Sequence, residues 1–333
     1  MRKYDVYGIG NALVDTEFEV ENKFFNDHQV EKGVMTLVDD ERQDYLTNLI
    51  DSNSVKKQSG GSAANTVIAV NQFGGKSFYS CRVANDDYGH FYMNDLKESG
   101  IHTNLNGYEL PTGTTGKCLV MVTPDADRTM NTYLGVSSDL DESVIVEDAL
   151  ATSKYLYLEG YLVTSEKGVG AMLKAKSLAE KHGVNTSITL SDPSIVTYFR
   201  SQFNEVIGDG VDMIFCNEEE ALTYTETNNL NDAKQRLTSM AKKFAITLGK
   251  KGALLFDGNQ FIDINSTPVT AIDSNGAGDM FAGSFLYGIT NGHSYEQAGR
   301  LASMAAAKVV TKFGPRLNSG HVKEVIDKLT ASV

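Results

Sequence analysis

The sequence predicts an α/β protein in which helices cover both faces of a central, mostly parallel sheet. From Lys154 onward, strand-like segments alternate with helix-like segments, a rhythm typical of parallel strands joined by crossover helices. Two earlier stretches, 16–38 and 116–135, show short alternating apolar and polar runs instead. These runs predict a small β-sheet over one edge of the main sheet. A chain of 333 residues with 41% hydrophobic residues is large enough for both parts.

The elements of the main sheet follow one another along the chain. The run KYDVYGIG (3–10) is typical of a buried strand, and the next helix is expected to start at an N-cap, Ser62, and to end at Gly74. The further expected elements are a strand at 77–84, a helix at 88–100, a strand at 154–160, a helix at 169–182, a strand at 184–192, a strand and helix over 212–225, a strand, turn and strand over 241–256, and helices at 276–290, 295–313 and after Ser319.

Composition and charge exclude several classes of protein. The formal net charge of −13 argues against a nucleic-acid-binding surface, which is usually basic. No apolar run approaches the length of a membrane span, and the start MRKYDVYGIG lacks the apolar core of a signal peptide. The three cysteines, Cys81, Cys118 and Cys216, are too scattered to suggest a disulfide framework or a zinc ribbon. We therefore expect a cytoplasmic protein with no membrane or nucleic-acid partner.

Two glycine-rich stretches resemble nucleotide-binding fingerprints but do not match them. GIGNAL (8–13) has Leu13 where a dinucleotide fingerprint needs its third glycine. FGGKS (73–77) would place the first glycine of a P-loop at Val70, inside the expected helix. Neither stretch predicts a nucleotide site.

The stretch IDSNGAGDMFAGSF (272–285) carries the strongest chemical signal. Asp273 precedes the small residues Gly276, Ala277 and Gly278, which open an apolar helix. Unpaired amides at a helix N-terminus bind anions, and small residues allow a phosphate to approach them closely. Asp279 beside such a site would serve as a base that takes a proton from an attacking hydroxyl. The alternative is an ordinary first-turn acid that complements the helix dipole.

Three further groups of polar residues and glycines fall at expected strand ends, where ligands bind in such sheets. Asn217 and Glu220 would hold a hydrated magnesium ion, or would simply cap a helix. The glycine-containing turn at 247–252 would wrap a nucleotide, or would be a plain hairpin turn. The third group suits a vicinal diol, although surface turns often carry the same residues: Asn11, Asp15, Gly60, Gly61 and Asn65.

In combination and in this order, the motifs resemble the ribokinase-like (PfkB-type) carbohydrate kinases. DSNGAGD resembles their C-terminal signature, NEEE their Asn-x-x-Glu and TLGKKG their Thr-x-Gly-x-x-Gly. The resemblance implies a three-layer α/β/α fold with a small β-sheet lid, and transfer of the ATP γ-phosphate to a primary hydroxyl. The lid would comprise 14–38 and 107–134, and the large domain 1–13, 39–106 and 135–333.

The resemblance also implies a role for each motif. Asp279 would be the base, and Gly276, Ala277 and Gly278 would form the anion hole. Asn217 and Glu220 would organise Mg²⁺ through water. The nucleotide would contact Thr247, Gly249, Gly252 and Asp273, and the acceptor would contact Asn11, Asp15, Gly60, Gly61 and Asn65. The resemblance leaves a monovalent-cation requirement open.

Within the family, GNALVD, GGSAANT and DSNGAGD are most similar to the motifs of adenosine kinases. That similarity implies that Arg128 reaches the transferring phosphate, although a solvated hairpin charge is the alternative. Tyr133, Tyr161 and Phe24 are candidates for an aromatic acceptor pocket, or for core packing. Two other functions stay open, namely a kinase of a free sugar such as ribose, fructose or a keto-sugar acid, and a non-catalytic regulator that binds a sugar or nucleoside. The protein is expected to be a monomer or a homodimer formed through the lid.

Overall fold

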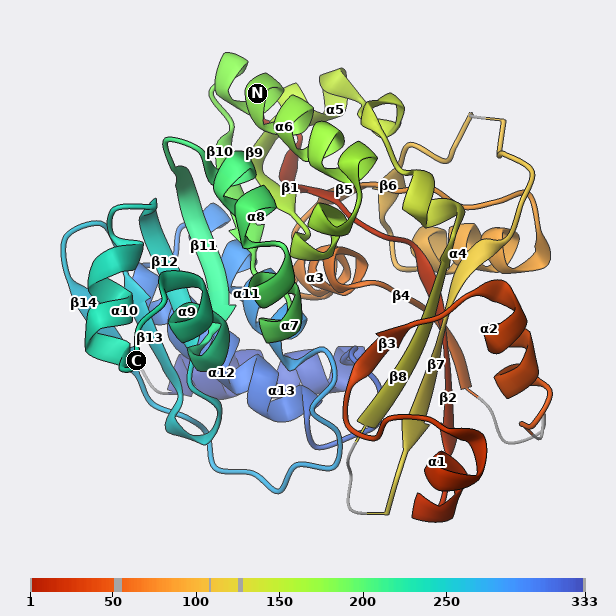
Figure 1. Cartoon of the computed structure of the whole chain (residues 1–333). Coiled ribbons are helices and arrows are strands. Elements are labelled where there is room, and N and C mark those ends of the chain that lie inside the picture. Colours follow the sequence, from red (N-terminus) through yellow and green to blue (C-terminus); the bar gives the residue numbers. More distant parts are fainter. Residues whose placement is uncertain (1, 51–55, 108, 125–127, 332–333) are drawn as a thin grey trace.

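The computed structural model describes residues 2–50, 56–107, 109–124 and 128–331. In these residues the strands form two sheets, one of nine strands and one of five (Figure 1). The large sheet has the order β14-β13-β12-β11-β10-β9-β1-β5-β6, and the small sheet has the order β3-β8-β7-β2-β4. The two sheets are the predicted architecture, a mostly parallel central sheet with a smaller sheet beside it.

The large sheet is parallel except at one edge. Its parallel strands are β1 (Tyr4–Ile9), β5 (Ser77–Ser80), β6 (His102–Thr103), β9 (Ser153–Leu158), β10 (Asn185–Thr189), β11 (Val211–Asn217) and β12 (Ala241–Thr247). The hairpin strands β13 (Ala253–Phe256) and β14 (Phe261–Ile264) extend it in antiparallel fashion. Because the other strands run in one direction, their carboxyl ends lie along one edge of the sheet.

Helices cover both faces of the large sheet, as the strand–helix rhythm predicted. Apolar side chains of α6, α8, α9 and α10 pack on one face, and those of α3, α4, α11 and α12 pack on the other. The helices around this sheet are α3 (Ser62–Gln72), α4 (Asp87–Glu98), α5 (Glu147–Ala151), α6 (Glu166–Lys181), α7 (Pro193–Tyr198), α8 (Arg200–Ile207), α9 (Glu218–Thr225), α10 (Leu230–Leu237), α11 (Ala277–Thr290), α12 (Tyr295–Val309) and α13 (Ser319–Ala331). None of the helices in the described residues is both long and apolar enough to cross a membrane.

The small sheet has two different faces because side chains alternate along each strand. Its strands are β2 (Leu13–Glu19), β3 (Met35–Leu37), β4 (Lys56–Gly60), β7 (Thr115–Val122) and β8 (Arg128–Gly135). On the outer face, Phe18, Leu119 and Met121 pack against α1 (Asn22–His28) and α2 (Asp40–Thr47). The inner face turns toward the large sheet and carries Leu13 and Met130. Neither covering helix was predicted from the sequence, because their short polar sequences show little helical periodicity.

Two of the connections between the small sheet and the rest of the chain are very short. Gly10, Asn11 and Ala12 join β1 to β2, and Gly61 alone joins β4 to α3. The strand β4 pairs with β2 in the small sheet, although the expected large domain, 39–106, included it. We therefore propose that the small unit also includes α2 and β4.

Candidate active site

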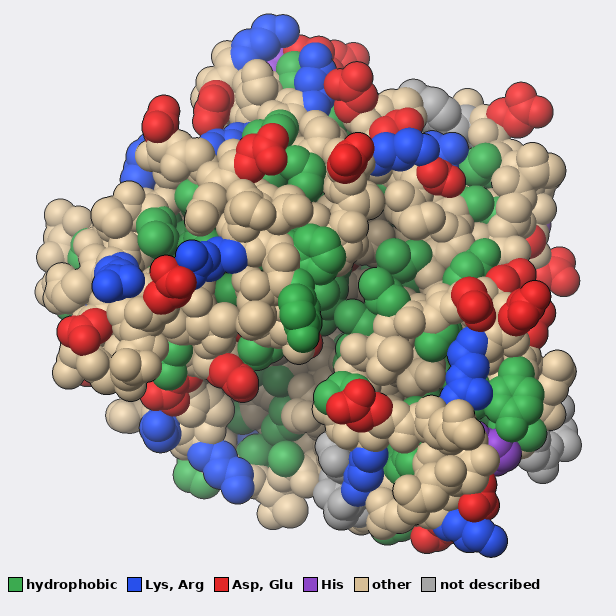
Figure 2. Space-filling view, viewed as in Figure 1, with side chains coloured by type: hydrophobic (Ala, Val, Ile, Leu, Met, Phe, Trp, Pro, Cys, Tyr) green, Lys and Arg blue, Asp and Glu red, His purple; other side chains and the backbone are tan. Residues whose placement is uncertain are grey.

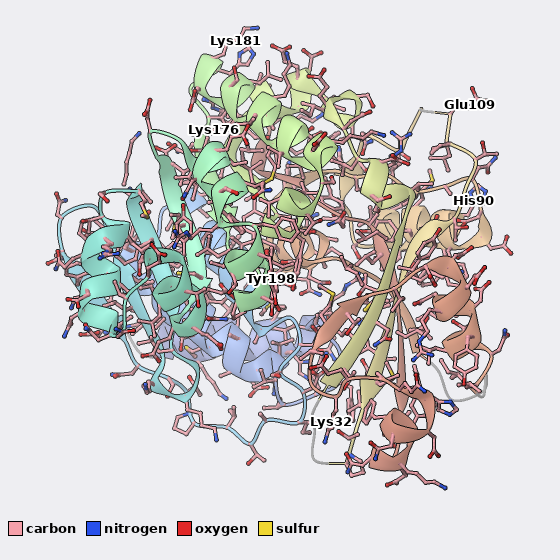
Figure 3. The ribbon with its side chains drawn as sticks, viewed as in Figure 1. Lys32, His90, Glu109, Lys176, Lys181 and Tyr198 are labelled. Atoms are coloured by element: carbon pink, nitrogen blue, oxygen red, sulfur yellow. The ribbon has the colours of Figure 1, made fainter. Side chains whose placement is uncertain are left out.

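A cavity of about 630 Å³ lies between the carboxyl ends of the large sheet and the inner face of the small sheet. Figure 2 shows the hollow between the two halves, with hydrophobic side chains on both of its walls. In Figure 3, Tyr198 lies at the end of α7 beside this space, and the side chain is 78% exposed. The position of the cavity follows the general rule that ligands bind beyond the carboxyl ends of parallel strands.

Asp279 lies in the first turn of α11, in the wall of the cavity. The Ser62 hydroxyl donates to its Oδ1 over 2.6 Å, and the Asn65 amide donates to its Oδ2 over 3.2 Å. Both partners come from the first turn of α3, so two helix N-termini meet at this carboxylate. Ser62 was expected to be the N-cap of α3, but that position belongs to Gly61, and Ser62 is the first helical residue.

The electrostatics of Asp279 suit a proton acceptor. Burial raises the pKa of this carboxyl to about 6, against the opposing effect of the hydrogen bonds from Ser62 and Asn65. At neutral pH the group is therefore ionised, yet it is a stronger base than an ordinary surface aspartate. The Oδ1 atom of Asn65 is buried with no protein partner and so is available to a donor on a ligand.

The turn before α11 has the shape expected of an anion site. Gly276 adopts a left-handed conformation (φ 70°), and a Cβ atom there would lie 2.2 Å from the Cβ of Pro315. A Cβ atom on Gly278, in contrast, would meet no atom within 4 Å, so the space above this residue is open. Amides in the first turn of a helix have no intrahelical acceptor. The Ala277 amide, which was expected to join the anion hole, instead donates to the Ser274 carbonyl over 3.3 Å. The turn can therefore offer the amides of Gly276 and Gly278 to an anion in the cavity.

Asn217 and Glu220 form a reciprocal capping box at the start of α9. The Glu220 amide donates to Asn217 Oδ1 over 2.8 Å, and the Asn217 side chain donates to Glu220 Oε1 over 2.7 Å. The helix-capping reading is thus correct for these two residues, which also line the cavity. Burial raises the pKa of Glu220 to about 7, against the hydrogen bond from the Asn217 amide.

The donor set around Glu220 fits a metal held mainly by water. No group of three or more His, Cys, Asp and Glu side chains with metal-binding geometry occurs in the described ranges. Mg²⁺ typically keeps several waters and takes one or two carboxylates beside substrate phosphates. A single buried carboxylate in the cavity wall is compatible with that mode of binding.

Glu159 is a cavity residue that was not predicted from the sequence. Its Oε1 accepts hydrogen bonds from the Asn11 backbone (3.1 Å) and side chain (2.9 Å), and its Oε2 accepts from the Ala63 amide (2.8 Å). Burial raises the pKa of Glu159 to about 7, although these three hydrogen bonds oppose the shift. Glu159 fixes the orientation of Asn11 and the start of α3. The signal for it was a lone acid at the end of the apolar run KYLYLEG.

Most of the residues singled out from the sequence lie together in the wall of this cavity. They are Asn11, Asp15, Gly61, Asn65, Tyr161, Asn217, Glu220, Thr247, Gly249, Gly276, Ala277, Gly278 and Asp279.

Three predicted site residues lie behind the wall instead. Gly60 packs against the Asp15 carboxylate, since a Cβ atom on this glycine would lie 2.2 Å from both carboxylate oxygens. Gly252 (φ 99°) packs against the backbone of Ile264. Asp273 is buried and accepts hydrogen bonds from the amides of Asn275 and Gly314, both over 2.8 Å. These residues shape the turns that carry the wall.

Of the three aromatic candidates for the acceptor pocket, only one lines the cavity. Tyr161 lines the cavity, whereas Phe24 packs with Phe18 on the outer side of the small sheet. Tyr133 lies between Thr132 and Leu134, which line the cavity, so strand alternation directs its side chain to the other face. Arg128 opens β8, and its side chain lies outside the part of the chain that the structure describes.

Comparisons with known proteins identify the class. Residues 33–320 match the model of the pfkB family of carbohydrate kinases. The fold superposes on the "probable sugar kinase protein" of Rhizobium etli and on the adenosine kinase of Sinorhizobium meliloti; each comparison gives a TM-score of 0.91, 34% identity and coverage of 98% of this chain and 99% of the other. The 5-dehydro-2-deoxygluconokinase of Clostridium beijerinckii is 25% identical over 93% of this chain and 88% of the relative.

The chain belongs to the pfkB family of carbohydrate kinases. It is a phosphotransferase that phosphorylates a sugar or a nucleoside, and membership of the family implies that ATP is the donor. The resemblance seen in the sequence motifs is confirmed.

Proposed function

We propose that this protein transfers the γ-phosphate of ATP, with Mg²⁺, to the primary hydroxyl of a nucleoside, with adenosine as the first candidate. The observation that carries the proposal is the position of Asp279, which Ser62 and Asn65 hold at the anion-binding turn inside the cavity. A base beside an anion site is what phosphoryl transfer to a hydroxyl requires.

The chemistry follows from the groups in the cavity wall. Asp279 takes the proton of the acceptor hydroxyl while the hydroxyl oxygen forms a bond to the γ-phosphorus of ATP. The bond from that phosphorus to the β–γ bridging oxygen breaks, and ADP leaves. The amides of Gly276 and Gly278 bind the charge on the transferring group, and each such donor is typically worth about 3 kcal/mol of transition-state stabilisation. Mg²⁺ bound through water at Glu220 would neutralise phosphate charge.

The inner face of the small sheet supports a nucleoside acceptor over a free sugar. The cavity wall there is largely apolar, as expected for the binding site of a nucleobase. Its apolar members are Leu13, Met35, Leu37, Cys118, Met130 and Leu134. A relative at 34% identity is an adenosine kinase, which agrees with this wall. A sugar kinase is equally similar, and a free sugar is therefore the second candidate.

The proposal also assigns roles to the small sheet and to Arg128. The small sheet would act as the lid over the acceptor, and Arg128 would reach the transferring phosphate from it. The outer face of this sheet is already covered by α1 and α2, which favours a monomer over a homodimer formed through that face. A cytoplasmic enzyme fits the use of ATP.

A panel of acceptors tests the proposal. ADP release would be measured with adenosine, other nucleosides, ribose, fructose and keto-sugar acids, each with and without K⁺ to reveal any monovalent-cation requirement. We expect adenosine to give the highest kcat/KM. Turnover of free sugars without turnover of nucleosides would overturn the nucleoside assignment. Tight binding of an acceptor without any turnover would favour the non-catalytic regulator.

A further inference from the structure

The loop after α12 contacts both halves of the site with three consecutive residues. Gly314 and Pro315 touch the turn that opens α11, and Arg316 touches the small sheet and α4. None of these three residues lines the cavity in the described structure. Their function must therefore be exerted through the residues that they hold.

On one side, the loop supports the anion-binding turn. The Gly314 amide donates to Asp273 Oδ2, while Asp273 Oδ1 accepts from the Asn275 amide, both over 2.8 Å. The ring of Pro315 lies directly against Gly276 and leaves no room there for a side chain. The position of the loop thus sets the position of the anion-binding turn.

On the other side, Arg316 grips the small sheet. Its Nη1 donates to Asp95 Oδ2 of α4 over 2.7 Å, and its Nη2 donates to the hydroxyl of Ser59 over 2.6 Å and to its backbone carbonyl. The Ser59 amide and hydroxyl also donate to the same Asp95 oxygen. Ser59 is fully buried in β4, and only 15% of the Arg316 side chain is exposed. Such a buried, forked contact is far more specific than a surface ion pair.

The strand that Arg316 grips also supports the acceptor side of the cavity. Ser59 pairs with Val14 of β2, next to Asp15. The following residue, Gly60, packs directly beneath the Asp15 carboxylate. One short loop therefore joins the floor of the acceptor site to the anion-binding turn.

We infer that Arg316 is a positioning residue that couples the acceptor site to the anion-binding turn, so that binding of one substrate favours binding of the other. The inference rests on the proposed function for the identity of the two ligands. A lysine cannot replace Arg316, because a single ammonium lacks the planar fork that reaches Asp95 and Ser59 together.

The first test measures the coupling between the two substrates. The Kd of a non-hydrolysable ATP analogue would be measured with and without adenosine for the wild type and for Arg316→Lys. We expect adenosine to tighten analogue binding about tenfold in the wild type, within the usual range of such couplings, and to have little effect in the variant. The kcat should fall more than the KM for ATP rises. Arg300→Lys is the control, because Arg300 forms an exposed pair with Glu296 on α12. Equal, measurable coupling in wild type and Arg316→Lys would refute the inference, whereas no binding of adenosine to either protein would refute the proposed function.

A second measurement does not depend on the acceptor. Amide hydrogen exchange of the free protein should become faster in Arg316→Lys in two segments that are distant in sequence, 57–61 and 274–279, and in neither segment in Arg300→Lys. Faster exchange in only one segment, or in neither, would overturn the inference that Arg316 bridges the two segments. Faster exchange in both segments, in an enzyme that phosphorylates no nucleoside, would support the bridge and refute the proposed function.

Discussion

Replacement of Asp279 by asparagine should separate activity from stability. Burial raises the pKa of this carboxyl from 3.8 to about 6 in the folded protein, so the folded state binds its proton more tightly than the unfolded chain. This shift adds stability below pH 3.8, and the stability is lost as the pH rises through 6. At pH 7 the ionised carboxylate therefore costs about 3 kcal/mol, at about 1.4 kcal/mol per pKa unit.

Asparagine removes this charge and keeps the shape of the side chain. Its amide oxygen can still accept from Ser62, but its amino group faces the donor of Asn65, and the lost hydrogen bond costs about 1 kcal/mol. The net gain is about 2 kcal/mol, which raises the melting temperature by about 3 °C for a chain of 333 residues. Turnover should fall between about 10²-fold and 10⁴-fold, because the base is lost.

The assays are ADP release at saturating ATP and acceptor, and thermal unfolding at pH 7. The control variant is Asp232→Asn, because Asp232 occupies the same position in α10, is exposed and lies outside the cavity wall. That variant should keep its turnover and lose a few tenths of a kcal/mol at most. A turnover of Asp279→Asn within tenfold of the wild type would refute the assignment of Asp279 as the base. A lowered melting temperature would refute the electrostatic argument.

Three further predictions follow from the geometry of the cavity wall. Gly276→Ala should destabilise the protein by about 2 kcal/mol or more, because the left-handed backbone and the contact with Pro315 leave no room for a Cβ atom. Gly278→Ala should keep the melting temperature and raise the KM for ATP, and equal stability of the two variants would contradict this prediction. The free energy of unfolding of the wild type should fall as the pH rises from 5 to 8, because the pKa of Glu159 is raised to about 7 in the folded state. Urea titrations at each pH should show a shallower fall for Glu159→Gln, and parallel pH profiles would contradict this prediction. Glu220→Gln should need about tenfold more Mg²⁺ for half-maximal rate at constant ATP, and an unchanged requirement would exclude Glu220 from the metal site.

The sequence predicted the main sheet and many members of the cavity wall because local signals mark them. Glycines before an apolar helix identify the turn at 276–278, and strand ends identify Asn11 and Asn217. The roles of Ser62 and Glu159 depend on contacts with residues more than 90 positions away, which no local pattern encodes. The bridge made by Arg316 joins positions 257 apart and was missed for the same reason.

The small helices α1 and α2 were missed for a different reason. They lie over the small sheet with few buried residues, namely Phe25 in α1 and Gln43 and Leu46 in α2. Such helices are stabilised by the surface on which they pack, and their own sequences carry little hydrophobic periodicity. Tyr133 shows the corresponding limit for a strand, because its residue type allowed either a ligand contact or core packing, and only the strand register directs it away from the cavity.

The short connections between the two sheets and the apolar wall of the cavity should respond differently to substitution. Gly10 to Ala12 and Gly61 leave little slack, so β2 and β4 stay close to the start of α3, where Ser62 and Asn65 hold Asp279. Apart from Leu13, the apolar wall is supplied by β3, β7 and β8, where substitutions should alter the outline of the cavity without moving Asp279. We therefore expect substitutions in this wall to change the choice of acceptor while the residues around Asp279 stay in place, which agrees with a probable sugar kinase and an adenosine kinase that are equally similar to this chain.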